Sequence, residues 1–317
     1  MKKILLGFIA ACFSSVAAAQ AYPSKPIRIM VAFPPGGPTD IIARLVSPKV
    51  SELLGQPVVV ENVTGAGGNI AAARVAKSDP DGYTILLHSS GFAVNPALSA
   101  NAGYDPQKDF VPVAIVASQP NVIIVNASLP VNTLGELLTL AKREKLAYAS
   151  PSSGTTPHLT AENLFKVRAK VDITHVPFKG AGPAVTAVLS GQPPIGSAAG
   201  SGPMPHIKSG KLRALAVSSG RRLASLPDVP TLTELGFAGM EDYTWVGLFV
   251  PAGTPREVVQ KLNDSVLRAV QAPDLKQRLD QLAFEVTAAP LDQTTEYLRS
   301  ELVKWAKVVK DTGAKVD

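Results

Sequence analysis

Short apolar runs rich in β-branched residues alternate with stretches of helical spacing along most of the chain. Between the first two runs, Ile41, Ile42, Leu45 and Val46 recur at the three- and four-residue intervals of one helix face. Such alternation of strand and helix is typical of an α/β protein with largely parallel sheets. The predicted strands are residues 27–32, 58–63, 83–88, 111–117, 122–125, 147–150, 173–176 and 212–217.

The end of the chain has a different pattern, in which helices predominate. Pro255 is placed to open one helix at its first turn. Leu298, Leu302, Trp305 and Val309 recur on one face of another predicted helix. We expect both helices to pack against the α/β core.

The length of the chain predicts two domains. Its 317 residues exceed what one hydrophobic core usually fills, and 46% hydrophobic against 18% charged residues is typical of a globular protein. Two turn-rich segments, 222–230 and 236–242, interrupt the alternation and suit a crossing between domains.

Residues 1–21 have the pattern of a secretory signal peptide. Lys2 and Lys3 precede an apolar run over 4–13 and a small-residue stretch over 14–21, which favours cleavage near Ala21. The only cysteine, Cys12, lies in this leader, so the mature chain is expected to have no disulfide and no thiolate metal site. Lipidation at Cys12 is the alternative. No later segment approaches the roughly 18 to 20 apolar residues of a membrane span, so an exported, soluble product is expected.

The charge of the chain argues against a nucleic-acid partner. Lys and Arg number 31 against 25 Asp and Glu, a net charge of +6, and removing Lys2 and Lys3 leaves +4. These charges are interleaved, whereas a nucleic-acid surface needs basic residues clustered on one face.

The first candidate binding loop covers residues 33–40, between a predicted strand and a helix. Gly36 and Gly37 let the backbone approach a ligand, and a helix start presents free N–H groups that suit a carboxylate or phosphate. Thr39 or Asp40 is expected to cap the helix, and a purely structural turn is the alternative. The loop matches neither dinucleotide nor nucleoside-triphosphate motifs.

Two further loops follow predicted strands in the same way. One is the glycine-rich segment 64–69, and the other contains His88, Ser89 and Ser90. All three loops fall at carboxyl ends of strands, the edge where open α/β sheets bind ligands. Together they predict an anion-binding crevice.

Two loops in the second half of the chain repeat this arrangement. Residues 150–158 carry hydroxyls and enter a helix that Thr155 or Thr156 is placed to cap. Residues 176–183 also join a strand to a helix, and Lys179 is available there for a carboxylate, with a solvated surface lysine as the alternative.

Enzyme signatures are mostly missing. The chain has no G-x-S-x-G elbow, no H-E-x-x-H and no Cys–His pair. His158 and Glu162 are spaced i, i+4 and with His88 or His175 form a weak metal candidate, against the simpler interpretation of His158 as a polar residue near a helix start. Asp40 as a general base lacks a partner carboxylate. We expect no metal and no cofactor.

Taken together and in order, these motifs resemble the receptors of the tripartite tricarboxylate transporter system, the Bug-type periplasmic solute-binding proteins. The resemblance spans essentially the whole mature chain. The matching segments are 22–28, 33–40, 60–68, 79–83, 152–158, 176–180, 206–217, 227–231, 245–248 and 251–255.

This resemblance implies a two-lobed α/β Venus-flytrap fold with a hinged cleft that closes on one small organic anion. It implies one lobe from 22–122 and 246–317 and a second lobe from 123–245. The chain departs from its relatives over 193–200, a loop expected to border the cleft. The expected ligand-binding residues are Phe33, Pro34, Gly36, Gly37, Asp40, Ser89, Ser90, Ser152, Ser153, Gly154, Thr155, His158, Phe178, Lys179, Gly180 and Ser197.

The function expected from the resemblance is a periplasmic receptor, monomeric and without enzymatic activity. It would bind a small mono- or dicarboxylate and deliver it to the membrane permease of a tripartite transporter. Two alternatives stay open: a periplasmic hydrolase or metal-dependent enzyme on the same scaffold, and a receptor that serves a signalling partner.

Overall fold

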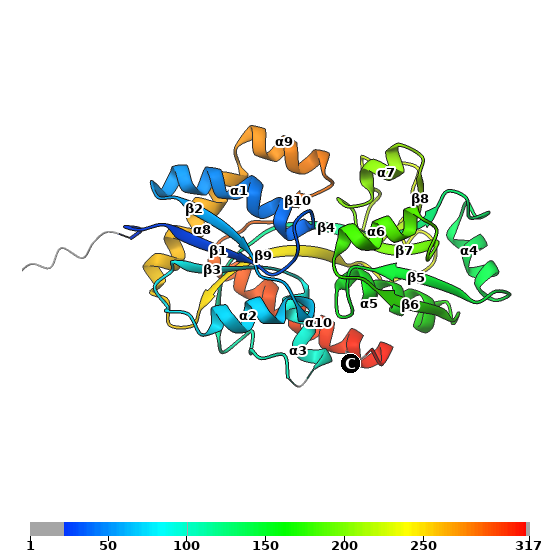
Figure 1. The fold of residues 1–317 in the computed structure, drawn as a ribbon, viewed down its shortest axis with the longest axis horizontal. Coiled ribbons are helices and arrows are strands. Elements are labelled where there is room, and N and C mark those ends of the chain that lie inside the picture. The colour runs from blue at the N-terminus through cyan, green and yellow to red at the C-terminus, as the bar shows by residue number, and fades with distance from the viewer. Residues whose placement is uncertain (1–21, 100, 315–317) are drawn as a thin grey trace, which may run out of the picture.

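The computed structural model describes residues 22–99 and 101–314 and shows two α/β lobes joined by long strands (Figure 1). The predicted signal peptide, its cleavage site and Cys12 lie outside the described residues. Within these ranges, no helix is both long and apolar enough to cross a membrane.

The first lobe is built on a sheet whose strands run in the order β2-β1-β3-β9-β4. The strand β1 pairs in parallel with β2 and β3, whereas β9 pairs antiparallel with β3 and β4. The strands are β1 (Ile27–Val31), β2 (Val58–Asn62), β3 (Thr84–Ser89), β4 (Phe110–Asn126), β9 (Tyr243–Pro251) and the short β10 (Glu285–Val286), which pairs with β4.

Helices cover both faces of this sheet, each with its own apolar core. One face is covered by α1 and α8, and the other by α2, α3 and α10. Leu298, Trp305 and Val309 of the last helix are buried, which confirms its predicted apolar face. The helices are α1 (Pro38–Leu54), η1 (Ala66–Gly68), α2 (Asn69–Ala76), α3 (Gly91–Leu98), α8 (Arg256–Val270), α9 (Pro273–Gln281) and α10 (Leu291–Thr312).

The second lobe has the same layered design. Its strands β5, β6 and β7 are parallel, and β7 and β8 both pair antiparallel with the far end of β4. One core lies under α4, α5 and η2, and the other under α6 and α7. The elements are α4 (Leu134–Ala141), β5 (Leu146–Ser150), α5 (Thr156–Glu162), η2 (Asn163–Arg168), β6 (Ile173–Pro177), α6 (Ala181–Leu189), β7 (Ile195–Ala199), α7 (Met204–Lys208) and β8 (Leu212–Val217).

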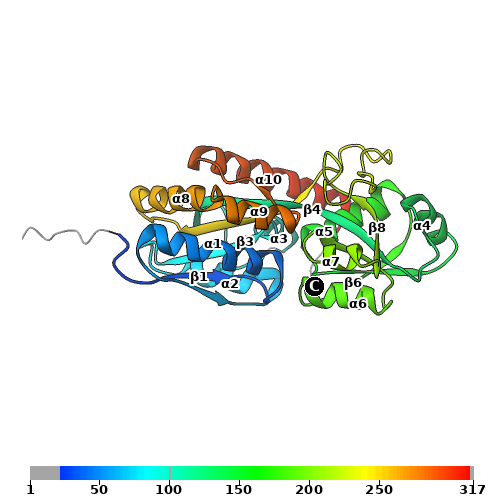
Figure 2. The same cartoon turned by 90° about the horizontal axis from the view of Figure 1, so that it is seen from above.

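Three elements connect the lobes: the strands β4 and β9 and the helix α10. The strand β4 pairs with β9 as far as Pro120 and with β7 from Asn121 onward, so it belongs to both sheets. The helix α10 lies along the connection and contacts α3 of the first lobe and η2 of the second (Figure 2). Glu301 on this helix accepts hydrogen bonds from the indole N–H groups of Trp245 and Trp305, at 2.7 and 2.8 Å.

The predicted sheet was wrong at its centre. Residues 111–117 and 122–125 form one strand, β4, because the polar segment between them stays extended and its buried side chains find partners, as Asn121 does with Asp242. The strands β7, β9 and β10 were not predicted. Since β4 and β9 are antiparallel to their neighbours, the sheets are parallel only away from the connection.

Candidate functional site

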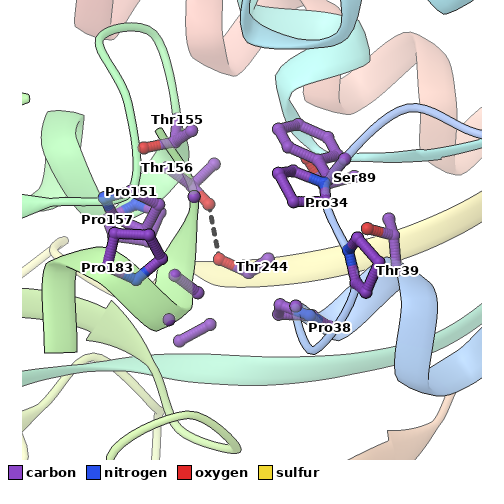
Figure 3. A pocket seen from close by; sticks show the side chains of 17 residues that line it. Pro34, Pro38, Thr39, Ser89, Pro151, Thr155, Thr156, Pro157, Pro183 and Thr244 are labelled. Atoms are coloured by element: carbon purple, nitrogen blue, oxygen red, sulfur yellow. Dashed lines mark hydrogen bonds between the residues drawn. The ribbon is translucent and has the colours of Figure 1, made fainter. Parts of the chain in front are cut away.

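A pocket of about 540 Å³, part of it open to solvent, lies between the lobes (Figure 3). Loops at the carboxyl ends of β1, β3, β5, β6 and β7 converge on it, as expected for α/β sheets. No charged side chain is among the described residues that line it. These are Phe33, Pro34, Pro35, Gly37, Pro38, Thr39, Ser89, Pro151, Thr155, Thr156, Pro157, Gly180, Ala181, Gly182, Pro183, Ala199 and Thr244.

The wall from the first lobe is the loop between β1 and α1. Gly37 is the N-cap of α1 and has no side-chain cap, so the predicted capping by Thr39 or Asp40 was wrong. Asp40 instead accepts a hydrogen bond from the Gly36 N–H at 3.0 Å and from Arg44 and Asn62. Burial opposes its ionisation, but these hydrogen bonds hold the pKa of Asp40 below its usual value. Asp40 therefore fixes the loop.

Two hydroxyl groups on this wall are available as donors. Thr39 is buried, and its hydroxyl makes no hydrogen bond to any residue that the structure describes. Ser89 Oγ accepts a hydrogen bond from the Gly91 N–H at 3.3 Å, which leaves its own hydrogen unused. Thr39 lies in the first turn of the 17-residue helix α1, whose free N–H groups favour an anion, and Ser89 lines the same pocket.

The wall from the second lobe is formed by the starts of α5 and α6. Thr155 occupies the N-cap position of α5 as predicted, but its hydroxyl donates to the Ser152 carbonyl at 2.8 Å and does not cap the helix. The nine-residue helix α6 begins at Ala181, and its first turn lines the pocket. Helix starts from both lobes thus face the same space.

A chain of hydrogen bonds forms the floor and crosses between the lobes. Ser90 Oγ lies 3.0 Å from Thr156 Oγ1. Thr156 Oγ1 in turn lies 2.6 Å from Thr244 Oγ1 (Figure 3). Thr244 donates to Asn121 Oδ1 at 2.7 Å, and Asn121 Nδ2 donates to Asp242 at 2.7 Å. Burial raises the pKa of Asp242 to about 6.

A second compartment of about 770 Å³ lies next to the pocket and contains Lys179, Ser152 and Phe178. The two compartments share only Phe33, Pro34, Pro151 and Gly180 among their lining residues. A Cβ atom added at Gly180 would lie 3.3 Å from Pro34 Cγ, so the two lobes are in close contact there. Lys179 therefore lines the neighbouring compartment and not the pocket itself.

The structure distributes the sixteen predicted site residues among three environments. Six line the pocket: Phe33, Pro34, Gly37, Ser89, Thr155 and Gly180. Three line only the second compartment: Ser152, Phe178 and Lys179. Seven line neither: Gly36, Asp40, Ser90, Ser153, Gly154, His158 and Ser197.

The buried members of this last group support the loops from behind. His158 Nδ1 accepts a hydrogen bond from the Gly154 N–H at 3.2 Å, and its ring stacks on His175 with centroids 4.0 Å apart. Burial lowers the pKa of His158 to about 4 and that of His175 to about 3. Glu162 accepts from the Tyr148 hydroxyl and pairs with Lys166. Over 22–99 and 101–314, no three His, Cys, Asp or Glu side chains are grouped to hold a metal.

Sequence analysis missed residues contributed by the unpredicted strands. Thr244 is the second residue of β9 and Ala199 ends β7, and a strand prediction at either place would have brought them to the same edge. Pro34 was the only proline among the predicted site residues, although Pro35, Pro38 and Pro183 also form much of the apolar wall. The small residues of β7 gave no β signal, because Gly196, Ser197, Ala198 and Ala199 lack branched side chains.

Comparison with known proteins gives the chain its family. A family model described as "Tripartite tricarboxylate transporter family receptor" matches residues 42–314. Protein BugT of Bordetella pertussis is 39% identical over 303 residues, 94% of this chain and 92% of BugT. A UPF0065 protein from the tcbD-tcbE intergenic region of Pseudomonas sp. strain P51 is 38% identical over 314 residues, 97% of this chain and 93% of that protein.

Solved structures of similar proteins have the same fold. Rpa4515 of Rhodopseudomonas palustris, solved with adipate, superposes with a TM-score of 0.89 at 33% identity, over 93% of this chain and 100% of that one. MatC of the same organism, solved with malate, superposes with a TM-score of 0.85 at 34% identity, over 91% of this chain and 100% of MatC. The periplasmic binding protein BugD superposes with a TM-score of 0.88 at 35% identity, over 93% of this chain and 99% of BugD. The chain belongs to the receptor family of the tripartite tricarboxylate transporters, as its motifs predicted.

Proposed function

We propose that the protein is a periplasmic receptor that binds one small organic carboxylate between its lobes. The observation that carries this proposal is the pocket, which combines apolar walls with helix starts from both lobes and two unused hydroxyl hydrogens. Partial positive charge at helix starts balances a carboxylate without a buried side-chain charge. Adipate and malate, the ligands of Rpa4515 and MatC, are both small carboxylates.

Binding in this account closes the lobes by population shift. A ligand that touches both walls makes its full set of contacts only when the lobes are together, so it stabilises that state. The proposed lobes are 22–122 with 246–317, and 123–245, so that both boundaries fall inside the connecting strands β4 and β9. The closed receptor then delivers its ligand to the permease of a tripartite transporter, as a monomer and without altering the ligand.

The proposal includes export. The leader over 1–21 directs the chain to the periplasm and is removed near Ala21. Asp40 holds the loop between β1 and α1 through its hydrogen bond with the Gly36 N–H, and His158 supports the loop behind the pocket through the Gly154 N–H. Neither residue is assigned a catalytic role.

The test is thermal unfolding of the mature protein against a panel of small carboxylates, followed by mass analysis of the recovered ligand. A ligand at about 100 times its Kd adds roughly 2.7 kcal/mol, a midpoint rise of about 5 to 10 °C. Recovery of the acid unchanged supports a receptor. A converted product supports the hydrolase alternative, and no shift with any acid contradicts the proposal.

A further inference from the structure

The hydrogen bonds of the pocket floor have a fixed direction. Asn121 Nδ2 lies 2.7 Å from Asp242 Oδ1, and a carboxylate only accepts, which assigns the nitrogen to that side and leaves Asn121 Oδ1 as an acceptor. Thr244 must then donate to Asn121 Oδ1. A hydroxyl has one hydrogen, so Thr156 donates to Thr244, and Ser90 in turn donates to Thr156.

The floor therefore offers only oxygen lone pairs to a ligand. The hydroxyl hydrogens of Thr156 and Thr244 are both used within this series of hydrogen bonds, in the direction of Asp242, although both residues line the pocket. Thr155 beside them has also committed its hydrogen, to the Ser152 carbonyl. The opposite wall differs, because Thr39 and Ser89 keep their hydroxyl hydrogens available.

This division gives the pocket a polarity. A carboxylate is an acceptor only, so it is matched by the donors beside α1 and opposed by the lone pairs of Thr155, Thr156 and Thr244. A polar group placed on the floor needs a hydrogen to give. No acidic side chain lines the described part of the pocket, so a neutral donor suits it better than an ammonium group.

We propose that the ligand is a hydroxycarboxylate, whose carboxylate lies at the start of α1 and whose hydroxyl donates to the acceptor pair Thr156 and Thr244. This inference rests on the proposed carboxylate receptor and names its substrate class. Thr244 and Thr156 are then specificity-determining residues, and Asp242 is a positioning residue that acts through Asn121.

The test compares matched acids that differ by one hydroxyl group. The pairs are lactate and propionate, 4-hydroxybutyrate and butyrate, malate and succinate, and 4-hydroxybenzoate and benzoate. Isothermal titration at pH 7 measures the Kd of each for the wild-type protein. We expect at least one hydroxylated acid to bind about tenfold more tightly than its partner, the effect of about one buried hydrogen bond.

Two variants then assign this preference to the floor. Thr244→Val keeps the shape of the side chain but removes the acceptor, and should reduce the preference to less than about threefold. Asp242→Asn removes the carboxylate that fixes the direction of the hydrogen bonds, and should also reduce the preference for the hydroxylated acid. Thermal unfolding of each variant checks that it folds. Thr231→Val, whose hydroxyl accepts from the Glu234 N–H away from the pocket, is the control and should keep the full preference.

The outcomes separate this inference from the proposed function. If unhydroxylated acids bind as tightly as their hydroxylated partners in every pair, or if both variants keep the preference, the assignment of the floor is overturned while the receptor stands. If no acid of any kind binds, the proposed function itself fails.

Discussion

Gly37 is the residue at which ligand binding and stability separate most clearly. It lines the pocket, its φ of −83° is open to any residue, and a Cβ atom there would meet only the Pro34 carbonyl at 3.6 Å. We expect Gly37→Val to raise the Kd of the carboxylate at least about tenfold, because the side chain occupies ligand space, while the unfolding midpoint stays within about 2 °C.

Gly55 provides the matched control for this substitution. It ends α1 far from the pocket, with a φ of +69° that a side chain strains. Gly55→Ala should therefore lower stability by about 1 kcal/mol and leave the Kd unchanged. If Gly37→Val binds as well as the wild-type protein, the loop does not touch the ligand.

Three histidines, the buried His88 and His158 and the half-buried His175, make the stability depend on pH. Burial lowers the pKa of His88 and His158 to about 4 and that of His175 to about 3, from 6.5. Between about pH 6.5 and pH 4 the unfolded chain thus binds more protons than the folded one, so the free energy of unfolding falls as the pH falls. Asp242, with its raised pKa of about 6, acts in the opposite direction but is one group against three.

Urea unfolding at pH 7 and pH 4.5 measures this dependence. We expect a clearly lower midpoint at pH 4.5, and a smaller difference between the two pH values in the His158→Gln variant, which loses one of the three groups. A midpoint that is equal or higher at pH 4.5 would show that the histidines are protonated in the folded protein.

At the scale of single elements, the segment η1 depends on a close approach to β3. Gly68 has a φ of +99°, and a Cβ atom there would come within 2.2 Å of Nε2 of the fully buried His88. We expect Gly68→Ala to cost about 3 kcal/mol in urea unfolding, from overpacking together with backbone strain.

Gly191 separates these two costs. Its φ of +76° imposes similar backbone strain, but the nearest atom to an added Cβ is 3.9 Å away. Gly191→Ala should therefore cost only about 1 kcal/mol. An equal decrease in the free energy of unfolding in the two variants would mean that contact with His88 adds nothing to the cost of Gly68→Ala.

The elements that sequence could predict are those whose pattern is local. Helical spacing and branched strand residues identified α1, α10 and β1, since burial of one face leaves its period in the sequence. The strand β7 escaped because Ser197 and its small neighbours have little β propensity of their own and are held by the adjacent strands. The strand β9 could have been predicted, since Trp245, Val246 and Phe249 are residue types that favour strands.

The same limit applies to the site. Loop positions followed from the rule that ligands bind at carboxyl ends of strands, so Gly37, Ser89 and Thr155 were within reach. The position of Lys179 in a separate compartment could not be predicted, because it depends on contact between Gly180 and Pro34 from different lobes. Contacts across a cleft have no local pattern in the sequence.

At the scale of the whole molecule, the hydrogen bond between Ser90 and Thr156 connects the lobes across the pocket floor. It forms only when the lobes are together, so it contributes to the stability of the closed state. We expect Ser90→Ala to raise the Kd of the ligand about two- to tenfold, the effect of about one hydrogen bond, in isothermal titration.

Ser51 is the control for this prediction. Its hydroxyl bonds to the Gln56 carbonyl at 2.9 Å within the first lobe, so Ser51→Ala should not change the Kd. If Ser90→Ala also leaves the Kd unchanged, this bond is as stable in the open state as in the closed one.

The most direct test of the whole account is the crystal structure of the protein with the tightest-binding acid of the panel. We predict one ligand molecule in the pocket, with its carboxylate beside Thr39, Ser89 and the start of α1, and with contacts to both lobes. Electron density for the acid in the compartment of Lys179, or on one lobe only, would contradict the account.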